Sequence, residues 1–193
     1  MSIKVIIRDA RIAYIQSLWT PGQYEGKGEY RYQATFLVPP GSKSFKDINA
    51  AIVGVAEELW KAKWKNKLEE FKHNPQKMCW FDGDKKPDSA GFPGNWALRA
   101  TRKQKDGPPA VVGRNRDMPI LESDGKLYAG CYVNGTVDIW AQSGTNAGIR
   151  CSLINVQYVK DGESFGGAAP ANLDGLEDLG FDPDEEYGDD IPF

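Results

Sequence analysis

The sequence is short of the residues on which several classes of site depend. It contains a single histidine, His73, and three widely spaced cysteines, Cys79, Cys131 and Cys151. One imidazole with no other histidine or cysteine at ligand spacing argues against a zinc centre of the usual nitrogen and sulfur kind. An odd number of distant cysteines argues against a disulfide framework, and it predicts reduced thiols that fill the core.

Long apolar runs and catalytic motifs are also missing. No stretch approaches the roughly 20 apolar residues that a membrane-spanning helix needs, and the opening MSIKVIIRDA lacks the apolar centre of a secretory signal. Neither a G-x-S-x-G motif nor a phosphate-binding Gly-Lys-Ser/Thr loop is present. We therefore expect a cytoplasmic protein with no cofactor and no enzymatic activity. Its 193 residues suffice for one self-sufficient core and an appendage.

Charge is unevenly distributed along the chain. Residues 161–193 contain eleven acids and no lysine or arginine, whereas all 24 basic residues and the other 16 of the 27 acids precede them. The body therefore carries +8 and the end −11, which together make the net charge of −3. A basic body attracts polyanions such as nucleic acid. The simpler alternative is that an acidic end only keeps the protein soluble.

The same boundary is visible in the composition. After Lys160, GESFGGAAPANLDG offers few apolar anchors and LEDLGFDPDEEYGDDIPF is densely acidic. Such a segment cannot bury enough surface to offset the entropy lost on ordering. We expect a globular domain at 1–160 and a flexible acidic tail at 161–193.

The first 160 residues indicate a mainly β fold with one helix. Residues 4–15 are rich in β-branched side chains, and residues 29–40 alternate until two prolines stop them. Residues 44–73 have helical periodicity, opened by a capping-box-like Ser44-x-x-Asp47. The apolar stripe of this helix rotates near Leu59, which predicts a bend there or packing against two surfaces.

Beyond Pro75 the sequence returns to short strand candidates separated by Gly, Pro, Asp and Asn. Residues 133–136, with the pair Asn134-Gly135, form the best short turn signal. Many short strands with one helix inserted after the early ones predict a small closed or half-open β-barrel with the helix plugging one end.

Aromatic and basic residues are interleaved over much of this body. Single strands of nucleic acid are held by a positive groove that follows the phosphates and by rings on which bases stack. In the strand candidate at residues 96–105, Arg99, Lys103 and Lys105 share one face. A row of positive side chains on one face is costly unless something negative meets it.

We therefore predict a site for single-stranded nucleic acid on the barrel. The predicted phosphate contacts are Arg31, Lys85, Lys86, Arg99, Arg102, Lys103, Lys105, Arg114 and Arg116. The predicted stacking rings are Tyr30, Tyr32, Trp80, Phe81, Tyr128 and Tyr132. Each ring has an alternative place in the core, where Trp and Tyr are often found. For Phe36, Phe45 and Trp140 we expect the core.

A metal-dependent enzyme is the rival interpretation. Asp82, Asp84 and Asp88 lie close together in the sequence, and paired carboxylates hold Mg²⁺ in nucleases and resolvases. The surrounding FDGDKKPDSAG is equally typical of an exposed loop.

The chain ends in an apolar ring fused to negative charge, in the five residues Asp189, Asp190, Ile191, Pro192 and Phe193. A basic groove that binds one polyanion binds another, so a tethered acidic tail is expected to compete with DNA for it. When DNA fills the groove, the released Phe193 and its carboxylate become available to an apolar pocket rimmed by bases on another protein.

This ending resembles the C-terminal tip of bacterial single-stranded-DNA-binding proteins, and the whole chain resembles a phage single-stranded-DNA-binding protein with an OB-fold. The resemblance implies an OB-fold-like barrel with one long inserted helix. It also implies sequence-independent binding and protection of single-stranded DNA during phage replication and recombination in the host cytoplasm. Residues 189–193 would then recruit replication and recombination proteins. The oligomeric state stays open, and a ring-forming strand-annealing protein is a further alternative.

Overall fold

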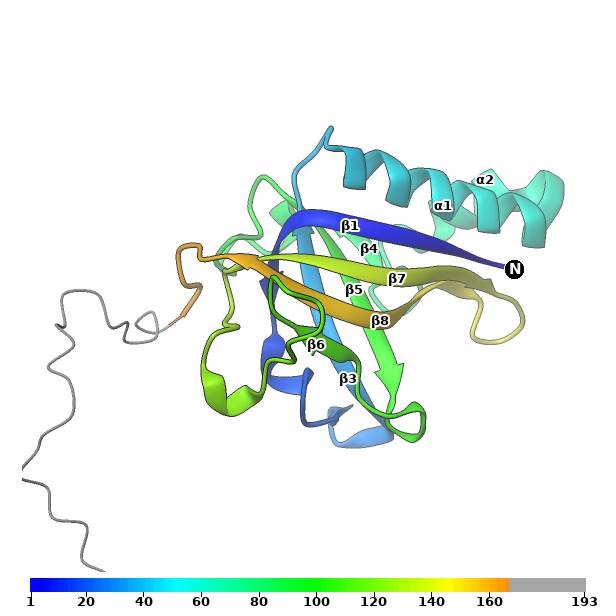
Figure 1. The fold of residues 1–193 in the computed structure, drawn as a ribbon. Coiled ribbons are helices and arrows are strands. Elements are labelled where there is room, and N and C mark those ends of the chain that lie inside the picture. The colour runs from blue at the N-terminus through cyan, green and yellow to red at the C-terminus, as the bar shows by residue number, and fades with distance from the viewer. Residues whose placement is uncertain (167–193) are drawn as a thin grey trace, which may run out of the picture.

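The computed structural model describes residues 1–166, drawn in colour in Figure 1. The strands of this part are β1 Ser2–Ala13, β2 Gly22–Tyr24, β3 Lys27–Val38, β4 Trp80–Asp82, β5 Trp96–Lys103, β6 Ala110–Val112, β7 Tyr132–Gln142 and β8 Gly148–Lys160. Its α-helices are α1 Lys43–Trp60 and α2 Trp64–Phe71. No helix within these residues is long and apolar enough to cross a membrane.

Five of the strands close into a barrel. Antiparallel ladders join β3 to β1, β1 to β7, and β7 to β8. Strand β8 then runs parallel to β5, joined to it at the pair Thr101–Ser152, and β5 returns antiparallel to β3. This closed order, β1-β3-β5-β8-β7, is the Greek-key arrangement of an OB-fold. The expected mainly β barrel with an inserted helix is confirmed.

Alternation along the strands decides which side chains fill the barrel. In β7, Val137 and Ile139 are buried while Asp138 between them is not, and β8 repeats the pattern. Because successive side chains point to opposite faces of a strand, the polar members form the outer surface. The three cysteines are free and buried, as expected. Burial raises the pKa of Cys79 to about 12, so this thiol stays protonated.

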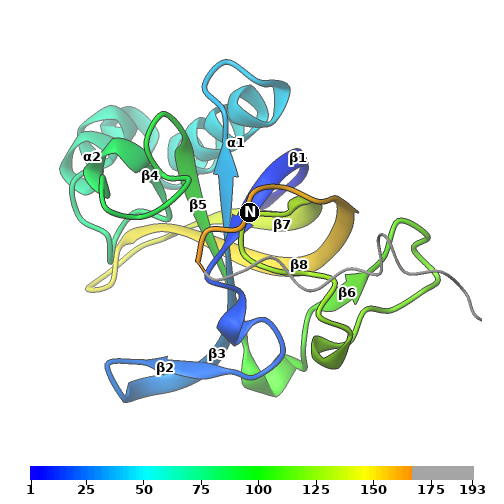
Figure 2. The same cartoon turned by 90° about the vertical axis from the view of Figure 1, so that its left-hand side faces the viewer.

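The helical region is interrupted where the apolar stripe rotates. Helix α1 ends at Trp60, Lys61 adopts a φ of 49°, and a single 3-10 turn leads into α2. The predicted bend near Leu59 is therefore confirmed. Both helices lie at one end of the molecule and the β2–β3 hairpin lies at the other (Figure 2).

The predicted start of the helix was wrong. The N-cap is Ser42, whose hydroxyl accepts a hydrogen bond from the Phe45 amide at 3.2 Å. Ser44 is buried, and its hydroxyl accepts from the amide of Arg8 in β1 at 2.9 Å. The serine that seemed to begin the helix instead ties it to the barrel.

The predicted turn at residues 133–136 was also wrong, because these residues lie inside β7. The Asn134 side chain accepts from the Asp9 amide at 3.0 Å, where the register of β1 shifts between Ile7 and Ala10. A Cβ on Gly135 would lie 2.6 Å from the ring of Phe36, which is fully buried. Asn134 thus bonds to the bulge in β1, and Gly135 allows the close approach of Phe36.

Replacing Gly135 by alanine is expected to lower the free energy of unfolding by about 1–3 kcal/mol, because the added methyl group overpacks the core at Phe36. Chemical denaturation followed by circular dichroism measures this loss. Gly113→Ala is the matched control, since a Cβ there would meet its nearest atom at an ordinary 3.6 Å. Equal stability of the Gly135 variant and the natural protein would contradict the role given to this glycine.

The segment that follows β8 contacts the barrel. The Tyr158 hydroxyl donates to Asp161 at 2.8 Å, and the Phe165 amide donates to the Ala129 carbonyl at 2.9 Å. The Phe165 ring lies against Gly91, with the Arg11 guanidinium carbon 4.3 Å from the ring centre. Residues 161–165 are therefore held by the domain, and the predicted tail from residue 167 onward lies outside the described residues.

Candidate nucleic-acid interface

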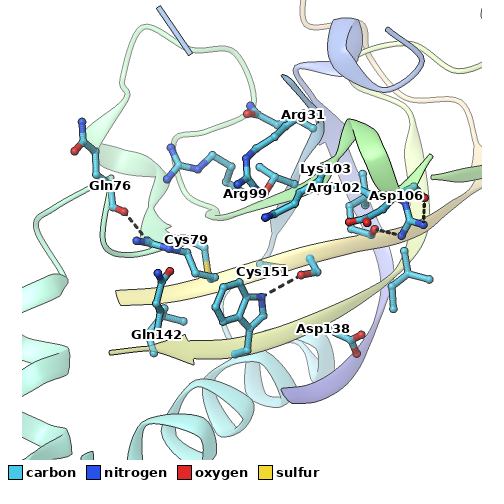
Figure 3. Close-up of a pocket in the computed structure, with 18 of the residues that line it drawn as sticks. Arg31, Gln76, Cys79, Arg99, Arg102, Lys103, Asp106, Asp138, Gln142 and Cys151 are labelled. Atoms are coloured by element: carbon cyan, nitrogen blue, oxygen red, sulfur yellow. Dashed lines mark hydrogen bonds between the residues drawn. The ribbon is translucent and has the colours of Figure 1, made fainter. Parts of the chain in front are cut away.

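A groove of about 590 Å³ crosses the outer face of the barrel (Figure 3). We call it the strand groove. Its walls include Arg31 and Gln33 of β3, Arg99, Thr101 and Lys103 of β5, Asp138, Trp140 and Gln142 of β7, and Arg150 and Ser152 of β8. Most of these residues alternate with buried ones along their strands. One face of each strand therefore contributes side chains to the core, and the opposite face contributes side chains to the groove.

Strand register brings these side chains into one continuous track. Arg31 pairs with Lys103 across β3 and β5, and Trp140 pairs with Arg150 across β7 and β8. Directly opposed side chains on one face have Cβ atoms about 5 Å apart. The two strand pairs meet where β5 touches β8. The track therefore runs from the basic pair Arg31 and Lys103 at one side to Trp140 beside Arg150 at the other.

Positive charge is concentrated in this track. Burial lowers the pKa of Arg150, and the nearby charges of Arg99 and Arg31 lower it further. Arg150 donates to the Gln76 carbonyl at 2.5 Å, and Arg99 donates to the Pro75 carbonyl. These contacts fix both guanidinium groups at the rim. Fixed like charges facing one cavity favour an anionic ligand such as a phosphate backbone.

Glu29 neutralises one end of the groove in the free protein. Its carboxylate lies 2.7 Å from Arg31 and 3.4 Å from Lys103. Partial desolvation raises the pKa of Glu29, but the hydrogen bond and charge of Lys103, with Arg31 and Lys105, outweigh it and hold the pKa below its ordinary value. Glu29 thus stays ionised, and any anionic ligand of the groove would compete with it for Arg31 and Lys103.

Trp140 is a groove residue, so the expectation that it belongs to the core was wrong. Its indole nitrogen donates to the Ser152 hydroxyl at 3.0 Å, which fixes the ring on the outer surface. The prediction also missed Arg150. In both cases the available signal was alternation, because Trp140 follows the buried Ile139 of β7 and Arg150 lies between the buried Ile149 and Cys151 of β8. Phe36 is in the core as expected, and Phe45 is partly buried and packs against the core.

The structure divides the nine predicted phosphate contacts. Arg31, Arg99 and Lys103 line the groove side by side (Figure 3). Arg102 reaches its edge, but its guanidinium donates to the carbonyls of Asp106 and Gly107 at 2.7 and 2.8 Å and so holds a turn. The other predicted bases lie outside the groove lining, and they are Lys85, Lys86, Lys105, Arg114 and Arg116.

None of the six predicted stacking rings lines the groove. Tyr32 and Trp80 are only 8% and 4% exposed. The prediction that these two stack on bases was wrong, because both point to the inner side of their strands. Tyr30 is 49% exposed but alternates with Arg31, and so it points away from the groove.

The remaining predicted rings lie near other parts of the surface. Phe81 packs partly buried against Phe92. The Tyr128 hydroxyl donates to the Gly162 carbonyl at 2.9 Å, and the Tyr132 ring lies 4.6 Å from the Lys160 ammonium. Tyr128 and Tyr132 thus flank the segment that follows β8.

The carboxylates of the rival interpretation shape a loop. Asp82 accepts a hydrogen bond from the Asp84 amide at 3.0 Å, and Asp84 accepts from the Gly94 amide at 2.8 Å. Among residues 1–166, no group of three or more His, Cys, Asp or Glu side chains is placed to hold a metal ion. The predicted partner-binding residues 189–193 lie outside the described part of the chain.

The chain is similar in sequence and in fold to proteins of bacteriophages. Putative protein p50 of Acyrthosiphon pisum secondary endosymbiont phage 1 is 34% identical over 186 residues, which are 95% of this chain and 98% of that protein. The single-stranded DNA-binding protein from bacteriophage Enc34, solved in complex with ssDNA, matches with a TM-score of 0.67 and 26% identity over 86% of this chain and 89% of that chain. The single-stranded DNA-binding protein gp2.5 of bacteriophage T7 shares the fold, with a TM-score of 0.55 and 15% identity over 94% and 98% of the two chains. Residues 3–187 match the family described as Enterobacter phage Enc34, ssDNA-binding protein, and the chain belongs to that family.

Proposed function

We propose that this protein binds and protects single-stranded DNA without sequence preference during phage DNA replication and recombination in the host cytoplasm. It acts as a binding protein and not as an enzyme. The observation that carries the proposal is the strand groove, in which Arg31, Arg99, Lys103 and Arg150 surround a cavity beside Trp140. Membership of the Enc34 family supports it.

The groove offers the two interactions that single strands need. Its basic side chains are held in place by backbone carbonyls or by Glu29, so they are positioned to bind phosphates. Trp140 supplies a flat surface on which any base can stack, because every base has a π face. In an OB-fold the second and third barrel strands form the binding face for oligonucleotides. Those strands are β3 and β5 here.

The acidic tail is the regulatory part of the proposal. Residues 167–193 contain nine of the eleven acids that follow Lys160. They compete with DNA for the groove, and the terminal residues 189–193 recruit replication and recombination proteins when DNA releases them. Charge complementarity with the groove and tethering to the same chain support this role.

Titration with poly-dT tests the proposal and the part that Trp140 plays in it. Intrinsic fluorescence is expected to be quenched on binding, with an affinity that falls as salt rises. Trp140→Leu is expected to lose most of the quenching and about 5- to 50-fold in affinity, because one stacked base is lost. Trp60→Leu, which alters a tryptophan packed against Phe71 of the helical region, is the control. Absence of any salt-dependent binding would refute the proposed function.

A further inference from the structure

A second aromatic and basic surface adjoins the strand groove. We call it the Tyr14 patch, and it consists of Tyr14, Phe81, Lys86 and Phe92. Phe92 is buried against Ala97 of β5 in a cluster separate from the main core. Ala97 precedes Arg99 by two residues, so it lies on the same strand face about 7 Å further along.

The patch combines an exposed ring with an available positive charge. Tyr14 is 39% exposed, and its ring centre lies 5.6 Å from that of the buried Phe92. The Lys86 ammonium lies 5.3 Å from the Tyr14 ring centre and 5.6 Å from that of Phe81. Within residues 1–166, Lys86 forms no ion pair with a carboxylate. The ring is supported from behind, and the charge beside it is free to meet a phosphate.

The backbone at Tyr14 adopts an uncommon conformation next to a loop of the barrel. Tyr14 has φ 54° and ψ 52°, a left-handed conformation that is uncommon for a bulky residue. It directly follows β1, at the start of the connection to β3. In an OB-fold this loop, between the first and second barrel strands, is one of those that contact oligonucleotides. This conformation places an exposed ring at the start of that loop.

We propose that the Tyr14 patch is an additional nucleotide subsite, in which a base of single-stranded DNA stacks on Tyr14 and a neighbouring phosphate pairs with Lys86. The inference rests on the proposed function and extends it. The strand groove and the Tyr14 patch then form one binding path over the face made by β3 and β5, with Arg99 between them. No sequence preference is needed, because stacking and phosphate pairing are common to all nucleotides.

Photo-crosslinking locates the bases directly. Oligo-dT of about 12 nucleotides, within the range that one OB-fold covers, is prepared with 5-iodo-deoxyuridine, irradiated with the full-length protein and analysed by peptide mass spectrometry. Crosslinks at both Tyr14 and Trp140 are expected. Crosslinks at Trp140 with none at Tyr14 would overturn the subsite and leave the proposed function intact. No binding of the oligonucleotide at all would overturn the proposed function itself.

Binding measurements on variants supply the second test. Tyr14→Asn removes the ring while keeping a residue that tolerates positive φ, and a roughly 5- to 20-fold loss of affinity for the oligonucleotide is expected. Tyr14→Trp keeps a ring and is expected to bind as the natural protein does. Lys86→Gln is expected to reduce the slope of log affinity against log salt by about 0.7.

Tyr30→Ala is the matched control, because that ring is also exposed but points away from the groove. Thermal melting of each variant separates loss of binding from loss of folding. Natural affinity in a folded Tyr14→Asn protein would refute the subsite. So would an equal loss in Tyr30→Ala.

Discussion

Replacing Arg99 and Lys103 together by glutamate is expected to lower the affinity for single-stranded DNA by about 100- to 1,000-fold at moderate salt. Both side chains project from one face of β5 into the strand groove. The change removes two of the proposed phosphate contacts and adds two repelling charges to a partly desolvated cavity. Fluorescence anisotropy with labelled oligo-dT at several salt concentrations measures the loss.

The control for this double variant has the same net charge. Lys63 and Lys65 are exposed in the helical region, away from the groove lining, and their replacement by glutamate makes the same change of −4. This control is expected to lose far less affinity. Because Arg99 also donates to the Pro75 carbonyl, melting temperatures and the milder Arg99→Gln, Lys103→Gln pair show whether folding contributes. Equal losses in both charge-reversed proteins would mean that binding follows net charge alone.

Ending the chain after Gly166 is expected to raise the affinity for single-stranded DNA about 10-fold, and the affinity for duplex by more. The deletion removes nine acids and no base, so the net charge moves from −3 to +6. In the proposed function, the deletion also removes a competitor tethered to the same molecule. Duplex, which is stiff and fits a narrow groove poorly, is expected to depend most on this competition. Filter binding with both forms of DNA measures the two affinities.

The position of the cut matters for this experiment. Ending the chain after Lys160 also removes Asp161, which accepts a hydrogen bond from Tyr158. It removes Phe165 as well, whose ring lies against Gly91. That shorter protein is expected to melt at a lower temperature. A full-length protein whose nine tail acids are changed to Asn or Gln is expected to behave like the one that ends at Gly166. Unchanged affinity after both treatments would refute competition by the tail.

The alternation of side chains between the two faces of a strand was the most informative pattern in the sequence. It identified β3 and β5 and placed Arg99 and Lys103 on one face, where the structure confirms them beside Arg31. The same rule held the information on Tyr32, which lies on the same strand face as the buried Ala34 and Phe36. Residue type suggested stacking there, but the strand face determines whether a ring can reach a base.

The remaining errors concern contacts between distant segments. The Asn134-Gly135 pair has the local chemistry of a turn, and only the approach of Phe36 and Asp9 explains its place inside a strand. Trp140 looked like a core ring because large aromatic residues usually are. Its exposure follows from the neighbouring β8, whose Ser152 takes its indole hydrogen bond. Such partners are 12 to 125 residues away and have no local signature.

One seam of the barrel is joined by fewer residue pairs than the others. Most neighbouring strands are joined over many residues, but β5 and β8 are bridged only at Thr101 and Ser152. Both residues lie in the wall of the strand groove. Because few ladder hydrogen bonds hold this seam, we expect β5 and β8 to yield more readily than the other strand pairs. In the proposed function, this compliance would let one site accept bases of different size.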